Sequence, residues 1–310
     1  MSKLLIEPSP HIRSSMTTQK IMLHVLIALF PSVVAGTILF GLRALLLVVL
    51  CATFSVLAEF IYNKIVKREQ TVSDLSAAVT GVILGLNLPP ELPVYMAFIG
   101  CVAAIVVVKQ FFGGLGQNFA NPAITARIIL MLSFTSYMTT WSDPFAYANN
   151  TDAVASATPL VAEELPSYMD MFLGVRGGCI GETCIAAILL GGIYLVSLGI
   201  INPVTPVAFI GTVALCTFIS GGDVLMEIMS GGLVFGAVFM ATDYATTPIT
   251  PIGKLIFAIG CGLITVVIRN FGTLPEGVSY SILVMNILSP LIDRYVKPRP
   301  FGFKKEVKAK

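Results

Sequence analysis

The sequence predicts an all-α polytopic membrane protein, with about ten transmembrane helices in two inverted five-helix repeats and with some helices broken. Three observations predict this fold: the composition, the spacing of apolar runs and an internal repeat. Of the 310 residues, 56% are hydrophobic and 12% are charged, and the mean hydropathy is +0.89. Soluble domains carry about 25% charged residues. The composition therefore excludes a soluble enzyme, a disordered protein and a nucleic-acid binder.

Apolar runs recur along the whole chain, and roughly 20 mostly apolar residues make one membrane-spanning helix. The runs fall at about 21–40, 44–62, 75–89, 93–112, 122–138, 180–200, 204–221, 228–242, 253–271 and 278–296. The third and the eighth are short and rich in glycine, and each ends in a proline or polar cluster. Such interruptions predict broken helices, which are tolerated at membrane depth where other protein or a cavity satisfies the freed backbone groups.

Charges outside these runs predict the orientation and the domain boundaries. The tail from Arg294 to Lys310 holds seven Lys or Arg residues and one acid, whereas the 139–178 segment holds five acids and one basic residue, Arg176. Positive residues stay on the cytoplasmic side, so both termini are expected in the cytoplasm. The chain then divides into a cytoplasmic N-terminal segment (1–20), a first five-helix repeat (21–138), an external loop (139–178), a second repeat (179–297) and a basic cytoplasmic tail (298–310).

An internal repeat without gaps relates the two halves. Residues 99–111 recur as 259–271 with six of 13 positions identical, and Lys109 in the first copy matches Arg269 in the second. Each copy belongs to a unit of five spans, and an odd number of spans forces the second unit to sit upside down in the membrane. The glycine-rich loop after each copy is therefore expected on opposite faces.

Charged residues within the spans are candidate functional groups, because a charge at depth costs at least about 2.5 kcal/mol on insertion scales. Asp243, at the break in the eighth span, is the candidate for an ion path. Lys109, Lys254 and Arg269 lie near span ends, where their side chains can also snorkel to the interface. The two histidines have no partners at metal-ligand spacing, and the six cysteines lie mostly in apolar runs as buried thiols. No protein-ligated metal is expected.

Several polar segments, taken together, resemble a known family. They are Ser9-Pro10-His11, Gln19-Lys20-Ile21-Met22, Gly116-Gln117-Asn118 followed by Asn121 to Arg127, Asp152 with Ala157 to Leu160, Met240 to Asp243, and Pro275 to Ser281. In this order they cover nearly the whole chain. They resemble the family that contains RnfD, a membrane component of the Rnf ferredoxin:NAD oxidoreductase, and NqrB, its counterpart in the sodium-pumping NADH:quinone reductase. The shorter N-terminus favours the Rnf branch.

The resemblance implies a covalent FMN on the external loop. In the family, a flavin transferase links FMN by a phosphoester bond to the last threonine of an Asp-x-x-Ser/Thr-Gly-Ala-Thr motif, a position that falls on Thr158. The usual Ser-Gly of this motif is replaced by Ala155-Ser156. The polar loop offers the exposed acceptor that a transferase needs. The inverted repeat places Arg269 near this flavin, where a cation would stabilise the reduced ring.

The resemblance also implies a noncovalent riboflavin. The related component of the sodium pump holds riboflavin against paired asparagines of an Asn-x-x-Asn-Pro-Ala motif, which match Asn118 and Asn121. An amide both donates and accepts hydrogen bonds, as the edge of the flavin ring requires. From the residues alone, Asn121 before Pro122 can instead cap the fifth helix.

The function that the resemblance implies is that of a flavin-carrying electron-transfer subunit in a redox-driven ion pump of the bacterial or archaeal cytoplasmic membrane. Electrons would pass between ferredoxin and NAD branches while Na⁺ or H⁺ is translocated, a choice that the sequence leaves open. The protein would act as part of a translocase, not alone. Its partners would be an external FMN-bearing subunit, iron–sulfur subunits and membrane lipid. The inverted repeat by itself fits a stand-alone channel or secondary transporter equally well.

Overall fold

The computed structural model describes residues 16–149, 155–156, 167–272 and 277–297, which fold into helices and one small sheet. The first half comprises α1 (Thr18–Phe40), α2 (Leu42–Val66), the 3₁₀ helix η1 (Val72–Asp74), α3 (Ser76–Leu86), α4 (Val94–Val102), the π-helix η2 (Ala103–Gln110), α5 (Pro122–Ser133) and α6 (Thr135–Met138). Between the halves lie β1 (Trp141–Ser142), α7 (Ala146–Asn149), β2 (Ala155–Ser156) and α8 (Tyr168–Leu173). The second half comprises α9 (Ile185–Ser197), α10 (Val204–Ser220), α11 (Val224–Met229), α12 (Leu233–Phe235), the π-helix η3 (Gly236–Met240), α13 (Pro251–Phe271) and α14 (Val278–Tyr295).

The distribution of side chains is that of a membrane protein. Large apolar side chains face outward, among them Phe30 (64% exposed), Leu42 (77%) and Phe218 (74%), whereas Glu59 and Lys109 are buried. Soluble monomers rarely expose large apolar patches. Three of the described helices, α1, α2 and α13, are long and apolar enough to cross a membrane, and α3, α4 with η2, α5, α9 and α10 are shorter apolar helices. The chain is therefore a helical membrane protein with several apolar helices.

Two of the short helices end inside the protein. Helix α3 has 11 residues, which at 1.5 Å per residue is roughly 16 Å, about half of a 30 Å hydrocarbon core. Its first turn is fixed by Asp74, whose Oδ1 accepts a hydrogen bond from the Ser76 backbone N–H at 2.8 Å. In the second half, α12 and η3 together run only from Leu233 to Met240. Broken helices of this kind place polar helix ends inside the protein.

Small residues let the short helix approach its neighbour closely. A Cβ atom at Gly81 would lie 2.6 Å from the Cys51 carbonyl oxygen of α2, and one at Gly85 would lie 2.9 Å from the Val48 Cα. Close backbone approach through small residues is how helices associate in membranes, where apolar burial gives no driving force. Helix α3 is thereby fixed against α2.

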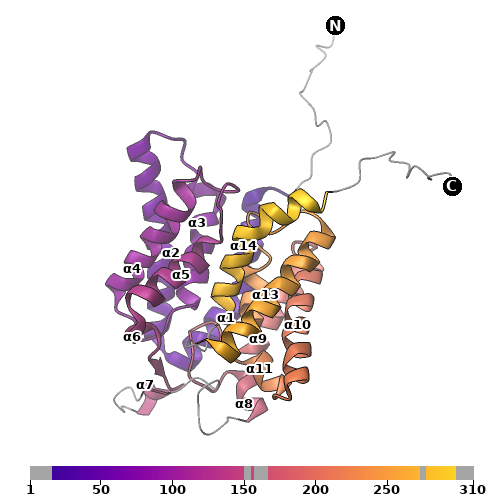
Figure 1. Ribbon diagram of the computed structural model, residues 1–310. Helices are drawn as coiled ribbons and strands as arrows, with labels where there is room; N and C mark the ends of the chain where they lie inside the picture. The colour runs from indigo at the N-terminus through magenta and orange to yellow at the C-terminus, as the bar shows by residue number, and fades with distance from the viewer. Residues whose placement is uncertain (1–15, 150–154, 157–166, 273–276, 298–310) are drawn as a thin grey trace, which may run out of the picture.

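The contacts between helices follow a similar order in both halves. Helix α2 packs against α3 and α4, and α10 packs against η3 and α13; across the halves, α1 packs against α9 and α5 against α14. Figure 1 shows α2 to α6 on one side and α10, α11 and α13 on the other, with α1 and α9 near the middle and α14 crossing in front of them. Helices α7 and α8 lie at the lower end, opposite the end where α14 finishes (Figure 1).

Candidate functional site

An inner cavity of about 90 Å³ lies between the two halves. Its walls come from α1, α3, α5, α9 and η3, and most of them are apolar, with Val79, Ile83 and Phe239 among the lining residues. Eight polar residues also line it: Ser76, Thr80, Lys109, Asn118, Asn121, Thr242, Asp243 and Tyr244. The asparagines singled out by the sequence, the candidate ion-path acid and one repeat cation therefore meet at one cavity.

A larger outer cavity of about 690 Å³ adjoins the inner one, because Met22, Leu115, Asn118 and Asp243 line both. Its lining also includes Thr18 at the start of α1 and residues of the last turns of α14. The two helices that carry the chain termini thus begin and end beside the same opening. An apolar pocket with a few convergent polar groups is the usual form of a cofactor site.

The two asparagines have different hydrogen-bonding states. The Asn118 Oδ1 atom is buried and has no hydrogen-bond partner within the described residues. Asn121 instead caps α5, its Oδ1 accepting hydrogen bonds from the backbone N–H groups of Ala123 (3.0 Å) and Ile124 (3.3 Å). Its Nδ2 donates to the Met240 carbonyl at 3.5 Å. A buried acceptor without a donor costs about 1–3 kcal/mol, so Asn118 is the asparagine that is open to a ligand.

Asp243 lies in the loop that follows η3. Its carboxylate accepts hydrogen bonds from the Ala245 backbone N–H at 3.3 Å and from the Thr246 Oγ1 at 3.2 Å. The residue lines both the inner and the outer cavity. No cation is seen against it among the ion pairs of the described residues.

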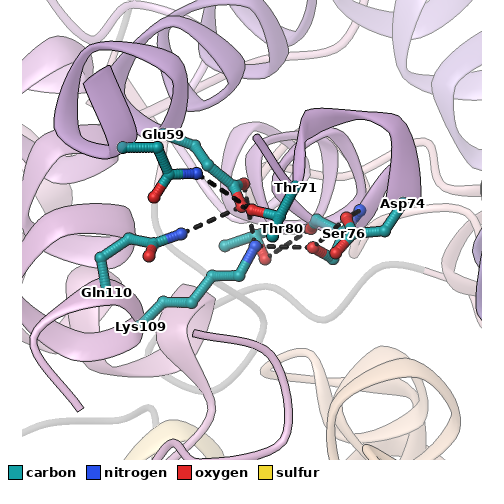
Figure 2. A network of polar contacts seen from close by, with 8 residues as sticks. Glu59, Thr71, Asp74, Ser76, Thr80, Lys109 and Gln110 are labelled. Carbon is teal, nitrogen blue, oxygen red and sulfur yellow. Dashed lines mark hydrogen bonds and ion pairs between the residues drawn. The ribbon is translucent and has the colours of Figure 1, made fainter. Parts of the chain in front are cut away.

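The position of Lys109 near a span end allowed its side chain to snorkel to the interface, but it does not. Lys109 is 2% exposed and forms an ion pair with Glu59, Nζ to Oε2 at 2.9 Å. Its Nζ also donates to the Ser76 Oγ at 2.6 Å. Gln110 donates to the other oxygen of Glu59 at 3.0 Å. Figure 2 shows how these side chains from α2, α3 and η2 converge. Insertion of two charges at this depth is tolerated because the pair and its hydrogen bonds satisfy both groups.

A second buried ion pair joins Arg127 of α5 to Glu182, which precedes α9. Arg127 Nη1 also donates to the Asn87 Oδ1 at 2.8 Å, at the end of α3. The Glu182 carboxylate fills the space beside Gly232, where a Cβ atom would lie 2.5 Å from its carboxyl carbon. This cluster connects α3, α5, α9 and α12. The sequence places charged residues in these spans, but it does not show that Arg127 and Glu182 pair. Their opposite charges were the sequence feature that could have suggested the pair.

Arg269 is also buried in an ion pair instead of snorkelling. Its Nη1 lies 2.9 Å from the Glu227 Oε1, and its Nη2 donates to the Ser230 carbonyl at 3.0 Å. Arg176, in the loop before α9, interacts electrostatically with the Arg269 charge. The pKa of Arg176 is lowered to about 10, chiefly by burial and also by the Arg269 charge, while the Glu182 charge opposes the shift. The Nε atoms of Arg176 and Arg269 are buried without an acceptor in the described part of the chain.

Thr158 and Asp152 lie outside the described residues, so the geometry of the attachment motif is not seen. The strand two residues before Thr158 is seen: β2 pairs antiparallel with β1, Trp141 opposite Ser156 and Ser142 opposite Ala155. The segment that leads to Thr158 is thus tied to the start of the loop. Within the described ranges, no three His, Cys, Asp or Glu side chains gather as a metal site.

Curated relatives match this chain over almost its full length. The chain is 47% identical to the D subunit of the Na(+)-translocating ferredoxin:NAD(+) oxidoreductase complex of Acetobacterium woodii, covering 99% of this chain and 98% of the relative. It is 43% identical to the D subunit of the proton-translocating ferredoxin:NAD(+) oxidoreductase complex of Clostridium ljungdahlii, with 96% of each covered. It is 32% identical to the D subunit of an Escherichia coli ion-translocating oxidoreductase complex, over 97% of this chain and 99% of the relative.

These names agree with the family expected from the motifs at Asn118 to Arg127 and at Thr158. The family model for NQR2, RnfD and RnfE matches residues 5–302, which is nearly the whole chain. The chain therefore belongs to the NQR2, RnfD, RnfE family.

Proposed function

We propose that this chain is the flavin-carrying membrane subunit of an Rnf-type, redox-driven ion pump, and that it passes electrons between the ferredoxin and NAD branches of the complex. The relatives carry names of such complexes. The observation that carries the proposal is the inner cavity, where a buried amide oxygen without a donor lies in an apolar pocket. The enzyme is the whole complex, and this chain alone is not active.

A riboflavin fits the polar groups that line the inner cavity; because it is larger than about 90 Å³, the rest of the molecule would occupy the adjoining outer cavity of about 690 Å³. The Asn118 Oδ1 needs a donor, and the ring N–H of an isoalloxazine is one. Lys109 supplies a donor at the same cavity, and Val79, Ile83 and Phe239 supply apolar wall. Bound there, a flavin supplies the capacity to accept and release electrons; the protein supplies orientation and charge. Asn121 contributes by fixing the start of α5 beside the cavity.

An FMN on Thr158 is the second proposed cofactor, attached by a flavin transferase through a phosphoester. Two buried arginines, Arg176 and Arg269, have Nε donors without acceptors among the described residues, and Arg176 lies in the loop before α9. A phosphate group and a reduced flavin are both acceptors for such donors. This charge pattern supports a flavin at the end of the molecule where α7 and α8 lie.

We infer ten spans in two inverted repeats, with both termini in the cytoplasm and the 139–178 loop outside. Three features support this topology: the similar order of helix contacts in both halves, the basic tail, and the placement of α7 and α8 opposite the end of α14 (Figure 1). The repeat cations have matching roles, since Lys109 bonds to Ser76 at the start of α3 and Arg269 bonds to the Ser230 carbonyl shortly before α12.

Asp243 is the proposed ion-path residue, because it lies at the end of a broken helix and lines both cavities. Carboxylate and carbonyl oxygens are the ligands of hard cations, and a carboxylate also carries a proton. The named relatives include both a Na(+)-translocating and a proton-translocating complex, so the proposal covers either ion. Membrane lipid, an external FMN-bearing subunit and iron–sulfur subunits are the proposed partners, in the cytoplasmic membrane of a bacterium or archaeon.

The proposal is tested on the intact complex, purified from its native membrane. After denaturation, this chain should keep a fluorescent flavin on its band, and the supernatant should contain riboflavin. Membrane vesicles should take up ²²Na⁺, or acidify, when ferredoxin is oxidised by NAD. A chain that carries neither flavin would refute the function. Loss of riboflavin in Asn118→Leu, with the covalent band intact, would assign the cavity.

A further inference from the structure

The Lys109 ammonium group has one hydrogen-bond donor that the described residues leave unused. A lysine ammonium carries three N–H donors, and two are taken, by the Glu59 Oε2 at 2.9 Å and by the Ser76 Oγ at 2.6 Å. The residue is 2% exposed, so bulk water does not take the third. Lys109 instead lines the inner cavity, together with Asn118.

We propose that Lys109 donates its third N–H to the ligand of the inner cavity and binds the reduced form of that ligand more tightly than the oxidised form. This inference rests on the proposed function, since the ligand concerned is the riboflavin. An electron that enters an uncharged ring adds negative charge, and a cation at hydrogen-bond distance lowers the energy of that state. The interaction is strong in this apolar surrounding, because the effective dielectric constant is far below that of water.

The surrounding network holds the ammonium group in place, as Figure 2 shows. Glu59 is itself fixed by Gln110 at 3.0 Å and by the Thr71 hydroxyl. Ser76 is fixed by its hydroxyl bond to Asp74 at the start of α3. Lys109 therefore does not need to move or to lose water when the ring is reduced, which is the condition for efficient charge stabilisation.

Glu59 is the positioning residue for this cation. It pairs with Lys109 at 0% exposure, so the local net charge is close to zero while the cavity holds a neutral ring. Removing Lys109 alone would leave the Glu59 carboxylate buried and uncompensated, which is strongly destabilising. Removing both charges avoids that penalty and still deletes the donor. The pair therefore provides both a single and a double variant for the test.

The chain offers a matched control lysine. Lys254 lies in the first turn of α13 and lines, with Thr205 and Asn202, a neighbouring cavity that shares part of its wall with the inner cavity. It does not line the inner cavity. Its substitution changes the total charge of the protein to the same extent as the substitution of Lys109, without replacing a residue that lines the inner cavity.

The experiment measures riboflavin dissociation constants in the oxidised complex and in the dithionite-reduced complex, by equilibrium dialysis and fluorescence of the extracted flavin. This readout ignores covalent flavins and does not depend on turnover. The variants are Lys109→Met, Lys109→Met with Glu59→Gln, Lys109→Arg, and Lys254→Met as control. The variants are compared by one ratio: the riboflavin Kd measured in the reduced complex divided by the Kd measured in the oxidised complex.

In Lys109→Met the ratio should rise at least tenfold, which for the two-electron couple between the oxidised and the dithionite-reduced flavin corresponds to a fall of about 30 mV in the reduction potential. In the double variant the ratio should also rise, though less, because the negative charge of Glu59 is removed too. Lys109→Arg, which keeps charge and donors, and Lys254→Met should stay within about threefold of the parent.

An unchanged ratio in both Met variants, or equal weakening of oxidised and reduced binding, would overturn the inference and leave Lys109 with a structural role. A rise in Lys109→Arg as large as in Lys109→Met would overturn the electrostatic explanation. A parent complex that contains no riboflavin would overturn the proposed function itself, and the inference with it. That result is recognised before any variant is made.

Discussion

Removing the positive charge of Arg127 should destabilise the protein more than almost any other single substitution. In Arg127→Met, the Glu182 carboxylate remains at 5% exposure without its counter-ion, and the Asn87 Oδ1 loses its 2.8 Å donor. Breaking a buried pair by removing one partner typically costs about 3–5 kcal/mol. We expect a loss in this range in the free energy of unfolding.

The double variant Arg127→Met with Glu182→Gln should recover part of this loss. It leaves neither member of the ion pair without its partner, so the remaining cost is the unsatisfied Asn87 oxygen, about 1–3 kcal/mol, together with the loss of the Glu182 charge that favours the buried Arg176 cation. The double variant should therefore be about 2 kcal/mol more stable than Arg127→Met. An exposed pair provides the control: Arg43 and Glu91 have side chains 57% and 41% exposed, so Arg43→Met should cost no more than about 1 kcal/mol.

The assay is pulse proteolysis of the detergent-solubilised complex in increasing SDS, with this chain quantified on gels. It reports the unfolded fraction without spectroscopic overlap from flavins. A loss in Arg127→Met no greater than in Arg43→Met, or a double variant as unstable as the single one, would refute the reasoning that the pair is buried in the folded protein.

The loops give three further predictions. Thr158→Val, co-expressed with the flavin transferase, should lose the fluorescence of the denatured protein band, and fluorescence that persists would contradict the attachment site. Cysteines at Asp143 and Lys308 should be labelled from opposite faces of the membrane; labelling from one face would contradict the odd number of spans between them. The hydrogen bond from the Tyr168 hydroxyl and the Met226 backbone N–H lower the pKa of Asp223, so this contact contributes stability above about pH 4 and loses it as the pH falls through the lowered pKa. In Asp223→Asn, the melting temperature should fall less steeply as the pH is lowered through the acidic range. An unchanged dependence of the melting temperature on pH would contradict this.

The sequence predicted the positions of the apolar helices well, because length and hydropathy determine them. It predicted the breaks less completely. The run 122–138 is two helices, α5 and α6, divided at Phe134, whose φ of −132° and ψ of 47° leave the helical region. The run 228–242 contains a glycine turn, where Gly231 and Gly232 both have positive φ. No proline marks either break, so hydropathy alone does not reveal them.

The candidate site was predicted in part. The motif placed Asn118 and Asn121 together, and the cap at α5 was the alternative that the residues themselves suggested; the cap is confirmed. Snorkelling was the wrong alternative for Lys109, since its partner Glu59 lies 50 residues away in the chain. An ion pair between distant spans depends on which helix faces pack against each other. The sequence pattern within one span carries no information on this packing.

The inner cavity joins charges from both halves of the chain, which in the proposed function matters for coupling electron transfer to ion movement. Lys109 comes from the first half and Asp243 from the second, and both line it. Asp243 accepts a hydrogen bond from Thr246. With its amide oriented to satisfy both neighbours, Asn286 donates to the Thr246 carbonyl at 3.2 Å and accepts from the Asn121 backbone N–H at 3.1 Å. In the proposed function, negative charge that arrives in this cavity repels the Asp243 carboxylate, and any displacement of Asp243 acts through Thr246 and Asn286 on the start of α5. Coupling requires one structural element whose state depends both on flavin reduction and on ion binding. In the proposed function, the hydrogen bonds from Asp243 through Thr246 and Asn286 to the start of α5 are that element.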